Sequence, residues 1–525
     1  MLWVDKAVEE IKKARAADLE TDELLIVRDE KTASGRVHVG SMRGVGIHGA
    51  AAEALAEAGV PVLFMYEIND FDPMDGLPAY LDQAAYEPYM GKPLNAVPSP
   101  EPGFDNYAEY FGQEFEQVIR DTGYDPTFYR ASELYVQGKL NGVIAQALDK
   151  AELIRQIYKE VSGAERPDDW YPINVICEQC GKVGTTRATG WDGQYVTYRC
   201  EPEMVAWAKG CGHTGRTTPF DGRAKLPWKV EWPAKWRTLN VAVEGAGKDH
   251  STKGGSRQVA ERISREVFDF FPPYDIPYEF FLVGGQKMSS SKGRGASARE
   301  IADLLPPVLF RLLLSGTQPM RAINFDPAGE TLPMLFDWYD RIAQKSWAGE
   351  ADDDARLFSL IHHGQPPEAH FLARFQTVAF LVQMPHVDMR EEFAALKGAP
   401  LTELEQGAIE ERAKYARQWL EEYAPERYRF EVQETLPEAA KGISAEQKAA
   451  LGAIAAYLTA HPEATGEELH AALHEIRKES DLPAKEFFGP VYLAILGKES
   501  GPQAGWFLTN LDRTFLLDRL HEASA

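Results

Sequence analysis

The sequence predicts an α/β fold, in which a domain built on a parallel sheet is interrupted by an insertion and followed by an all-α C-terminal domain. Three observations predict it. Residues 23–66 have the pattern of strand, turn, helix and strand, four cysteines lie within residues 177–211, and alanine- and leucine-rich segments with helical spacing follow from residue 352 onward. A strand–helix–strand unit implies parallel strands.

The N-terminal elements alternate between helix and strand patterns. Residues 5–19 have helical spacing with mixed charges, and residues 23–27 form a short apolar strand. After a turn of small residues, we expect a helix over residues 45–58 and a second strand over residues 60–66. In such a unit a nucleotide binds at the carboxyl ends of the strands, where the helix N-terminus offers N–H groups to phosphate.

The turn after the first strand, residues 33–41 (ASGRVHVGS), combines small residues with one histidine. Ser34 and Gly35 keep the turn tight, and Gly40 allows a ligand to approach closely. His38 can donate to a phosphoryl oxygen as negative charge develops there. Alone, the segment is explained more simply as a glycine-rich turn with a capping serine and an incidental histidine.

A second loop favours the functional interpretation of this turn. Residues 278–283 (YEFFLV) read as a buried strand, and residues 284–295 (GGQKMSSSKGRG) follow as a loop rich in glycine, lysine and serine. Adenylyl transfer needs positive charge at the pyrophosphate, and a mobile loop carrying Lys287 and Lys292 can bring it there when ATP binds. Alone, this loop could equally be a basic surface turn; paired with the first segment, it is better explained as a catalytic loop.

Two further segments fit between these loops. Residues 228–236 contain three tryptophans, and a glycine-rich segment, residues 244–255, follows a strand pattern over residues 238–243. An acidic residue after such a strand end can bind ribose hydroxyls, and Asp249 is the candidate. The indoles could equally be core packing.

All four cysteines of the chain fall within 35 residues. Cys177 and Cys180 have the spacing of a zinc site, and clustered thiols favour a metal over disulfides in a chain without other cysteines. Ten residues separate Cys200 from Cys211, so His213 could replace one thiolate. We therefore predict a structural zinc site; the alternative is a module that kept its thiols and lost the metal.

The formal net charge of −24 argues against a broad, non-specific binder of nucleic acid, so we expect no DNA partner. A specific RNA could still dock on local basic patches. The candidates on the two loops are Arg36, Arg43, Lys287, Lys292 and Arg294. The sequence has neither a signal-peptide pattern nor an apolar run of about 18 residues, which predicts a cytoplasmic protein with no membrane contact.

These segments resemble, in order and spacing, the signatures of the class I lysyl-tRNA synthetases, whose HIGH motif corresponds to residues 38–41 and whose KMSKS motif corresponds to residues 287–291. The resemblance covers roughly residues 20–320. It also includes residues 89–98, the cysteine cluster, residues 228–236 and residues 247–250. The resemblance implies a ligase that uses ATP, with Mg²⁺, to convert L-lysine to lysyl-adenylate and transfers the lysyl group to the 3′ end of tRNA(Lys).

The resemblance also implies roles for single residues. The catalytic residues would be His38, Lys287 and Lys292. ATP would be bound by Ser34, Gly35, Gly40, Ser41, Asp249, Met288, Ser289, Ser290 and Ser291. Lysine would be bound by Thr32, Trp232, His250, Tyr278 and Glu279. Ser41 and Ser290 depart from the family pattern, and because Ser290 brings no charge, Lys292 is expected to supply the missing cation.

Two alternatives stay open. A glutamyl-type synthetase carries an arginine ten residues before the signature histidine to hold a carboxylate, and Arg28 has that position here. A lysine site should instead pair the ammonium with a carboxylate and aromatic walls. Carboxylate candidates are Glu30, Glu67, Asp70 and Glu279. The second alternative is a synthetase-like paralogue that uses another acceptor.

The expected domain organisation follows from these assignments. A split Rossmann-type catalytic domain comprises residues 1–85 and 231–285, and residues 86–230 form an insertion with the cysteine cluster at 177–213. Residues 286–350 contain the catalytic loop and contact the tRNA stem. Residues 351–525 form an α-helical anticodon-binding domain, for which a scaffold or dimerisation domain is the alternative.

Overall fold

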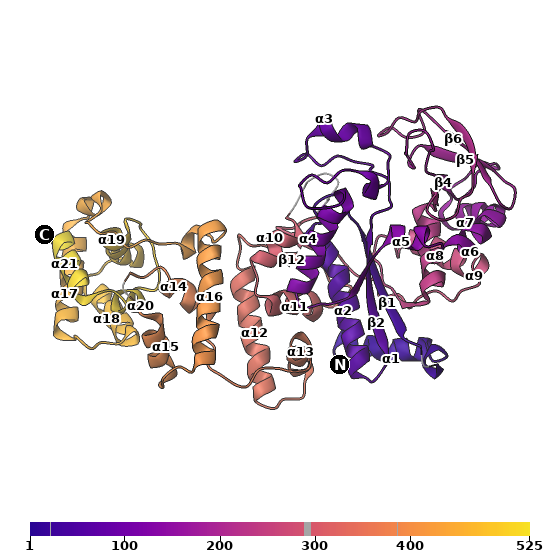
Figure 1. Ribbon diagram of the computed structural model, residues 1–525. Helices are drawn as coiled ribbons and strands as arrows, with labels where there is room; N and C mark the ends of the chain where they lie inside the picture. Colours follow the sequence, from indigo (N-terminus) through magenta and orange to yellow (C-terminus); the bar gives the residue numbers. More distant parts are fainter. Residues whose placement is uncertain (22, 288–295, 386) are drawn as a thin grey trace. The chain divides into compact units, whose positions relative to one another are not determined.

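The computed structural model (Figure 1) describes residues 1–21, 23–287, 296–385 and 387–525. The chain forms two compact units, of which the first comprises Met1–Phe325 and Ile342–Pro367 and the second comprises Asp326–Arg341 and Glu368–Ala525. The division falls within helix α12 (Thr331–Trp347). Each unit is described by itself.

A four-stranded parallel sheet is the centre of the first unit. Its order is β3 (Thr127–Arg130), β2 (Val62–Asn69), β1 (Leu25–Thr32) and β9 (Val241–Val243). Parallel bridges from Val243 to Tyr274 and from Gly247 to Tyr278 continue the sheet beyond β9. The predicted parallel α/β fold is confirmed. β3 and α4 (Tyr107–Asp121) come from the segment 86–230.

Helices cover both faces of this sheet. Neighbouring residues of a strand point to opposite faces. On β1, Asp29 contacts His48 of α2 (Met42–Glu57), whereas Glu30 contacts Lys235 of α8 (Trp228–Leu239). Therefore α2 and α8 pack on opposite faces, as a Rossmann-type sheet requires.

Several elements differ in length from the predicted ones. The predicted helix over residues 5–19 is α1 (Trp3–Ala14) followed by a 3₁₀ turn. Three helices follow β3 in the chain: α5 (Ala131–Val136), α6 (Asn141–Asp149) and α7 (Ala151–Ser162). Both β1 and β2 extend three or more residues past the predicted strands, through Arg28 to Thr32 and through Glu67 to Asn69. These extensions carry charged side chains that the structure buries in ion pairs.

The cysteine-containing segment folds into short antiparallel strands. β4 (Asn174–Val175) pairs with β8 (Ala224–Lys225), and β6 (Val196–Cys200) lies between β5 (Thr186–Trp191) and β7 (Thr214–Thr217). Later in the chain, β10 (Phe281–Val283) lies between antiparallel β11 (Gln286–Lys287) and parallel β12 (Ile323–Phe325). The remaining helices of this unit include α9 (Ser256–Glu266), α10 (Ala298–Asp303), α11 (Pro307–Gly316) and α13 (Asp353–Ile361).

Helices are the only regular secondary structure among the described residues of the second unit, which confirms the predicted C-terminal fold. Its helices after α12 are α14 (Phe375–Leu381), α15 (Met389–Lys397), α16 (Glu403–Glu422), α17 (Ala445–Ala460), α18 (Gly466–Glu479), α19 (Ala484–Leu496), α20 (Ala504–Thr509) and α21 (Arg513–Ser524). Its core forms where α17 packs against α19 and α21, and where α18 packs against α20.

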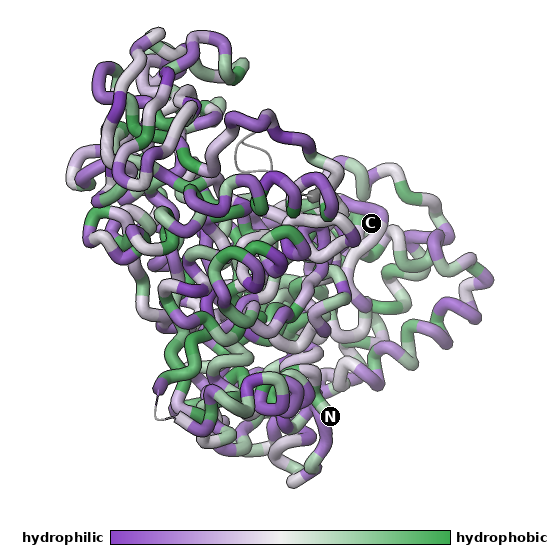
Figure 2. Tube along the Cα trace, turned by 90° about the vertical axis from the view of Figure 1, so that its right-hand side faces the viewer, coloured by the Kyte–Doolittle hydropathy of each residue, from purple (hydrophilic) through white to green (hydrophobic). Residues whose placement is uncertain are grey.

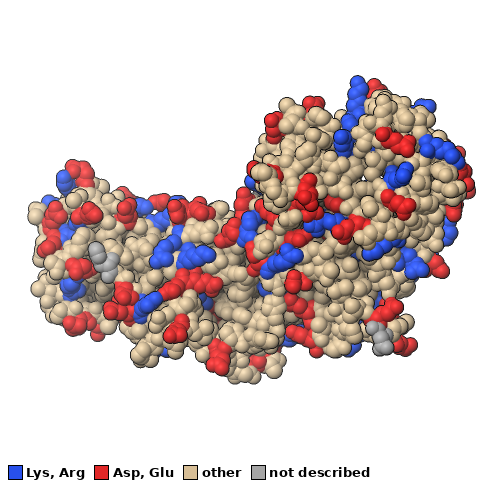
Figure 3. All heavy atoms as spheres, viewed as in Figure 1, with Lys and Arg blue, Asp and Glu red and all other residues tan. Residues whose placement is uncertain are grey.

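The surface is mixed in polarity. Hydrophilic and hydrophobic residues alternate along the helices (Figure 2), and acidic and basic side chains are interspersed on the face shown in Figure 3. Among the described residues, none of the helices combines the length and the apolar character needed to cross a bilayer.

Two glycines of α2 let this helix pack tightly against its neighbours. A Cβ atom on Gly49 would lie 2.4 Å from Cδ1 of Tyr124, and one on Gly46 would lie 2.6 Å from Cβ of Leu314. The ring of Tyr124 is buried, and its hydroxyl is bonded to Ser315, so it cannot easily move aside.

We expect Gly49→Ala to lower the free energy of unfolding by about 1–3 kcal/mol, because an added methyl group overpacks this contact. Gly142→Ala in α6 is the matched control: a Cβ there meets nothing within 4 Å, so the change should be neutral or stabilising. Urea unfolding curves of both variants provide the measurement, and equal midpoints would contradict the expectation.

Candidate active site

The first signature turn begins where β1 ends, and two tyrosines hold it in place. The backbone N–H of Arg36 donates to Oη of Tyr80 (2.7 Å), and the hydroxyl of Tyr107 donates to the carbonyl oxygen of Ser34 (3.1 Å). Gly35 has φ +146°, and a Cβ on it would lie 2.8 Å from Oη of Tyr80. The turn therefore needs glycine at this position for both its conformation and its packing.

His38 and Gly40 lie against each other within this turn. A Cβ atom on Gly40 would lie 2.7 Å from Nδ1 of His38, so a larger residue would displace the imidazole. A short 3₁₀ turn, Val39–Ser41, leads directly into α2. Ser41 makes no capping hydrogen bond to α2, so the simple explanation of this serine as a helix cap does not hold.

The chain just after the second signature lies next to the first signature. The N–H of Val39 donates to the carbonyl of Ala296 (3.2 Å), and the N–H of Ala298 donates to the carbonyl of Val37 (2.8 Å). These bonds flank an antiparallel bridge between His38 and Ser297. The backbone of Lys287 lies in β11, whereas Met288, Ser289, Ser290, Ser291, Lys292 and Arg294 lie outside the described residues. Residues 296–298, which follow the second signature, thus lie beside the first signature, although the two segments are far apart in sequence.

Arg43 does not belong to a basic patch for RNA, which corrects the interpretation of the sequence. Its side chain is fully buried and donates to backbone carbonyls at and after the C-terminal end of α11, including those of Leu314 (2.6 Å) and Gln318 (2.7 Å). Carbonyls at a helix C-terminus lack intrahelical partners, so Arg43 stabilises the fold there.

Arg28, the residue that left the glutamyl-type alternative open, is fully buried among carboxylates. Its guanidinium donates to Glu30 (2.5 Å), Glu67 (2.8 Å) and Glu244 (2.7 Å), and its Nε donates to the hydroxyl of Tyr129. Burial alone would raise the pKa of Glu30, but Arg28 and Lys235 lower it below its usual range. For Glu244, burial outweighs Arg28 and raises the pKa. Arg28 therefore has carboxylate partners within the protein.

The ion pairs continue from Arg28 toward the insertion. Lys235 contacts Glu67 and Glu231 (3.1 Å), and Glu231 accepts from Lys225 (2.6 Å). Lys225 also contacts Asp72 (2.9 Å). We call these eight residues the buried charge group: Arg28, Glu30, Glu67, Asp72, Lys225, Glu231, Lys235 and Glu244. Its five carboxylates exceed its three cations by two.

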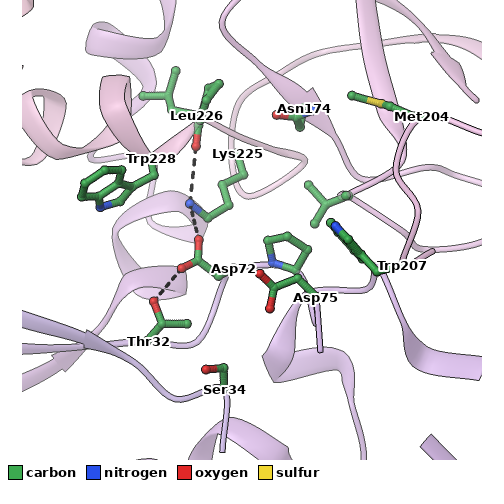
Figure 4. Close-up of a pocket in the computed structure, with 14 residues that line it drawn as sticks. Thr32, Ser34, Asp72, Asp75, Asn174, Met204, Trp207, Lys225, Leu226 and Trp228 are labelled. Atoms are coloured by element: carbon green, nitrogen blue, oxygen red, sulfur yellow. Dashed lines mark hydrogen bonds and ion pairs between the residues drawn. The ribbon is translucent and has the colours of Figure 1, made fainter. Parts of the chain in front are cut away.

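A cavity of about 560 Å³ opens beside this group at the carboxyl end of β1 (Figure 4). Thr32 donates to Oδ2 of Asp72 (2.7 Å), and Lys225 contacts the other oxygen of the same carboxylate. Trp228 lies on one side of the cavity, and Trp207 lies on the other. A cavity with aromatic walls and a few converging polar groups is the usual form of a small-molecule site.

Of the predicted site residues, Thr32 and Ser34 line this cavity. Trp232 is buried and donates to Glu244 (2.7 Å), and it stacks on Trp228, which lines the cavity. His250 lies against the indole of Trp228, with 5.2 Å between the ring centroids. Asp72, Lys225 and Trp228 also line the cavity and were not predicted from the sequence, although the acidic segment after the second strand was a signal for Asp72.

The other predicted lysine and ATP residues have local partners. Glu279 accepts from Lys248 (2.7 Å), so its charge is already paired. Tyr278 is bonded through its backbone to Ala246 and Lys248, and burial raises the pKa of its hydroxyl well above the usual value. The Asp249 carboxylate lies close to the backbone of Gly247, because a Cβ on Gly247 would be 3.0 Å from Oδ1 of Asp249.

The four cysteines converge as predicted. The sulfur atoms of Cys177, Cys180, Cys200 and Cys211 all lie within 4.8 Å of one another. The pairs Cys177–Cys211 and Cys180–Cys200 are 3.6 and 3.7 Å apart. Sulfurs around a tetrahedral zinc ion are separated by about 3.8 Å, given Zn–S bonds of about 2.3 Å. His213 is not part of this group; its ring packs near Tyr198 instead.

Comparisons with known proteins agree with this geometry. Residues 1–365 match the family described as tRNA synthetases class I (K), and residues 392–524 match the family described as anticodon binding domain. A lysine–tRNA ligase of Methanosarcina barkeri is 35% identical over 542 residues, which cover 99% of this chain and 97% of the relative.

Two other relatives are similar over their full length. The lysine–tRNA ligase 1 of Methanosarcina acetivorans is 34% identical, with 100% of this chain and 98% of the relative covered. The lysine–tRNA ligase of Pyrococcus furiosus is 32% identical, with 99% of each chain covered. Since these matches include the residues of both signatures, the chain belongs to the class I lysyl-tRNA synthetases.

Proposed function

We propose that this protein activates L-lysine with ATP and transfers the lysyl group to the terminal adenosine of tRNA(Lys). The observation that carries the proposal is the family match over residues 1–365, which contain both signatures and the cavity. In the first step, the lysine carboxylate attacks the α-phosphorus of ATP and pyrophosphate leaves. In the second, a ribose hydroxyl of the tRNA attacks the carbonyl carbon and AMP leaves.

For the first step, we assign His38 to a phosphoryl oxygen, where its N–H stabilises the developing charge. The ATP side of the site comprises Ser34, Gly35, Gly40, Ser41 and Asp249. We assign Lys287 and Lys292 to the pyrophosphate, with Ser289, Ser290 and Ser291 as hydroxyl donors and Met288 as a further residue of the same loop. Mg²⁺, when bound, would supply additional positive charge to the phosphates. The contacts between residues 37–39 and residues 296–298 support this assignment, because they hold the chain that directly follows the loop residues beside His38.

The charges beside the cavity favour lysine over glutamate. A desolvated ammonium needs a carboxylate, and the buried charge group has two carboxylates in excess. A substrate carboxylate at Arg28 would have to displace Glu30, Glu67 or Glu244. We therefore add Asp72 and Trp228 to the predicted lysine residues Thr32, Trp232, His250, Tyr278 and Glu279. A cytoplasmic location stays a prediction.

Amino-acid-dependent exchange between ATP and pyrophosphate tests this proposal. We expect exchange with lysine and none with glutamate or glutamine, measured with and without tRNA(Lys), because the charge excess at the cavity repels an acidic side chain. Exchange with glutamate would establish the glutamyl-type alternative, and the absence of exchange with all three amino acids would favour a paralogue with another acceptor.

A second test addresses His38. We expect His38→Ala to lower the exchange rate by roughly 10²- to 10³-fold with an unchanged melting temperature, since one donor to the transition state is lost. His521→Ala, in the exposed last turn of α21, is the matched control and should retain the wild-type rate. A wild-type exchange rate in the His38→Ala variant would contradict a catalytic role for this residue.

We also propose that the four cysteines hold one structural zinc ion. The sulfur separations and the positive φ of Gly181 (+72°) in the turn after Cys180 support it. Zinc analysis of the purified protein should give about one ion per chain. Cys180→Ser should lower both the zinc content and the melting temperature, because a site of four thiolates loses one ligand.

His213→Ala is the control for this zinc site and should retain the metal. Loss of zinc from His213→Ala, or full zinc content in Cys180→Ser, would contradict the four-cysteine assignment.

A further inference from the structure

The loop that connects the last two cysteines contributes to the cavity at the end of β1. Met204 and Trp207 both line this cavity, and both belong to residues 201–210, which lie between Cys200 and Cys211. We call residues 201–210 the wall loop. The backbone N–H of Cys211 donates to the sulfur of Cys200 (3.3 Å), so the two ends of the wall loop lie together. The cysteine cluster therefore closes the loop that brings an aromatic side chain to the cavity.

Trp207 is packed tightly against neighbouring backbone. A Cβ atom on Gly184 would lie 2.5 Å from Cη2 of the indole, so the ring lies directly over this glycine. The same Cβ atom would lie 3.1 Å from Cβ of Pro73. Since Pro73 directly follows Asp72 in the chain, the indole is held beside the segment that carries the carboxylates of the cavity.

A second connection joins the cysteine-containing segment to these carboxylates. The N–H groups of Val183 and Gly184 both donate to the carbonyl of Gly91 (2.7 and 3.0 Å), and the N–H of Gly91 donates to the carbonyl of Met74 (2.8 Å). Met74 directly precedes Asp75, which lines the cavity. The cysteine-containing segment thus supports both the aromatic wall and the acidic wall of the cavity.

The two carboxylates of the lining have different surroundings. Asp72 has a donor at each oxygen, Thr32 at one and Lys225 at the other. Within the part of the chain that the structure describes, no lysine or arginine pairs with Asp75. Burial, followed by the neighbouring charge of Asp72, raises the pKa of the Asp75 carboxyl. A positive charge beside Asp75 would relieve both effects, so this side of the cavity favours a cation.

The two ends of the cavity differ in their relation to the first signature. Thr32 and Ser34 lie at one end in Figure 4, and the chain continues from them into the turn that contains His38. Met204 and Trp207 lie at the other end. A lysine whose carboxylate reacts near His38 must direct its side chain away from that turn. Its ε-ammonium is then carried toward the wall loop.

We propose that Trp207 and Asp75 bind the ε-ammonium of lysine, and that the four-cysteine site holds Trp207 in place through the wall loop. The indole offers a cation–π contact, which strengthens as water is excluded, and the carboxylate supplies the charge that a desolvated ammonium needs. The inference deepens the proposed function and rests on it, because it requires lysine as the substrate. The proposed zinc ion then stabilises the amino-acid site as well as the insertion.

Equilibrium dialysis of the full-length protein tests the assignment without ATP or tRNA. The analogue ε-aminocaproate retains the ε-ammonium of lysine and lacks the α-ammonium, whereas norleucine retains the α-ammonium and lacks the ε-ammonium. We expect Trp207→Ala to weaken binding of lysine and of ε-aminocaproate by roughly 5- to 30-fold, the equivalent of about 1–2 kcal/mol, and that of norleucine by about twofold at most. Asp75→Asn should weaken the first two ligands and leave norleucine unchanged.

Two further variants control this measurement. Trp207→Phe should recover most of the affinity, because it retains an aromatic plane. Trp191→Ala removes another partly buried tryptophan of the cysteine-containing segment, outside the cavity lining, and should bind all three ligands as the wild type does. Unchanged lysine binding by Trp207→Ala, or equal losses with the two analogues, would overturn the inference alone. A wild-type protein that binds no lysine would overturn the proposed function with it.

Removal of zinc tests the role of the cysteine cluster. We expect a chelator that removes the ion to weaken lysine binding by the wild type to about the level of Trp207→Ala. The same treatment should have little further effect on Trp207→Ala, because the aromatic contact is already lost and effects on one contact are not additive. Zinc content and melting temperature are measured on each sample. Equal further weakening in both proteins would overturn the link between the cysteine cluster and Trp207.

Discussion

The structure of the first unit depends on the buried ion pairs around Arg28. This one side chain holds carboxylates from three places in the sheet: Glu30 on β1, Glu67 on β2 and Glu244 just after β9. Moving an ion out of water costs several kcal/mol, and the cost is offset only when its partners are all in place. The register of three strands must therefore be correct before any one of these charges is tolerated, so the group selects a single alignment of the sheet.

The same ion pairs connect the sheet to β8 of the cysteine-containing segment. Lys235 on α8 bridges Glu67 and Glu231. Lys225 on β8 bridges Glu231 and Asp72, which lies at the edge of the cavity. Asp72, which lines the cavity, is thus held by a lysine from a separate segment. In the function we propose, a cationic substrate would balance the excess of carboxylates over cations in this group. On that proposal, the stability of the sheet and the selectivity for the amino acid have one physical origin.

The sequence predicts the apolar part of this architecture and misses the charged part. Residues 23–27 are recognisable as a strand because they are apolar, whereas Arg28 to Thr32 resemble a loop, since no sequence pattern shows that their charges are paired across strands. The signature turn and the cysteine cluster are predictable because each needs particular residue types at short spacing. Trp228 and Trp232 are one helical turn apart, so their spacing does not reveal which indole lines the cavity.

The tryptophans also show why residue type alone does not define a site. Trp232 and Trp236 both donate to Glu244 and are buried, so their N–H groups serve to satisfy a carboxylate inside the protein. Trp207 packs against a glycine and remains partly exposed beside a cavity. In the first case the polar atom of the indole determines its position, and in the second the absence of a side chain at Gly184 does. The neighbouring residue, more than the tryptophan itself, decides whether the ring stabilises the core or remains open to a ligand.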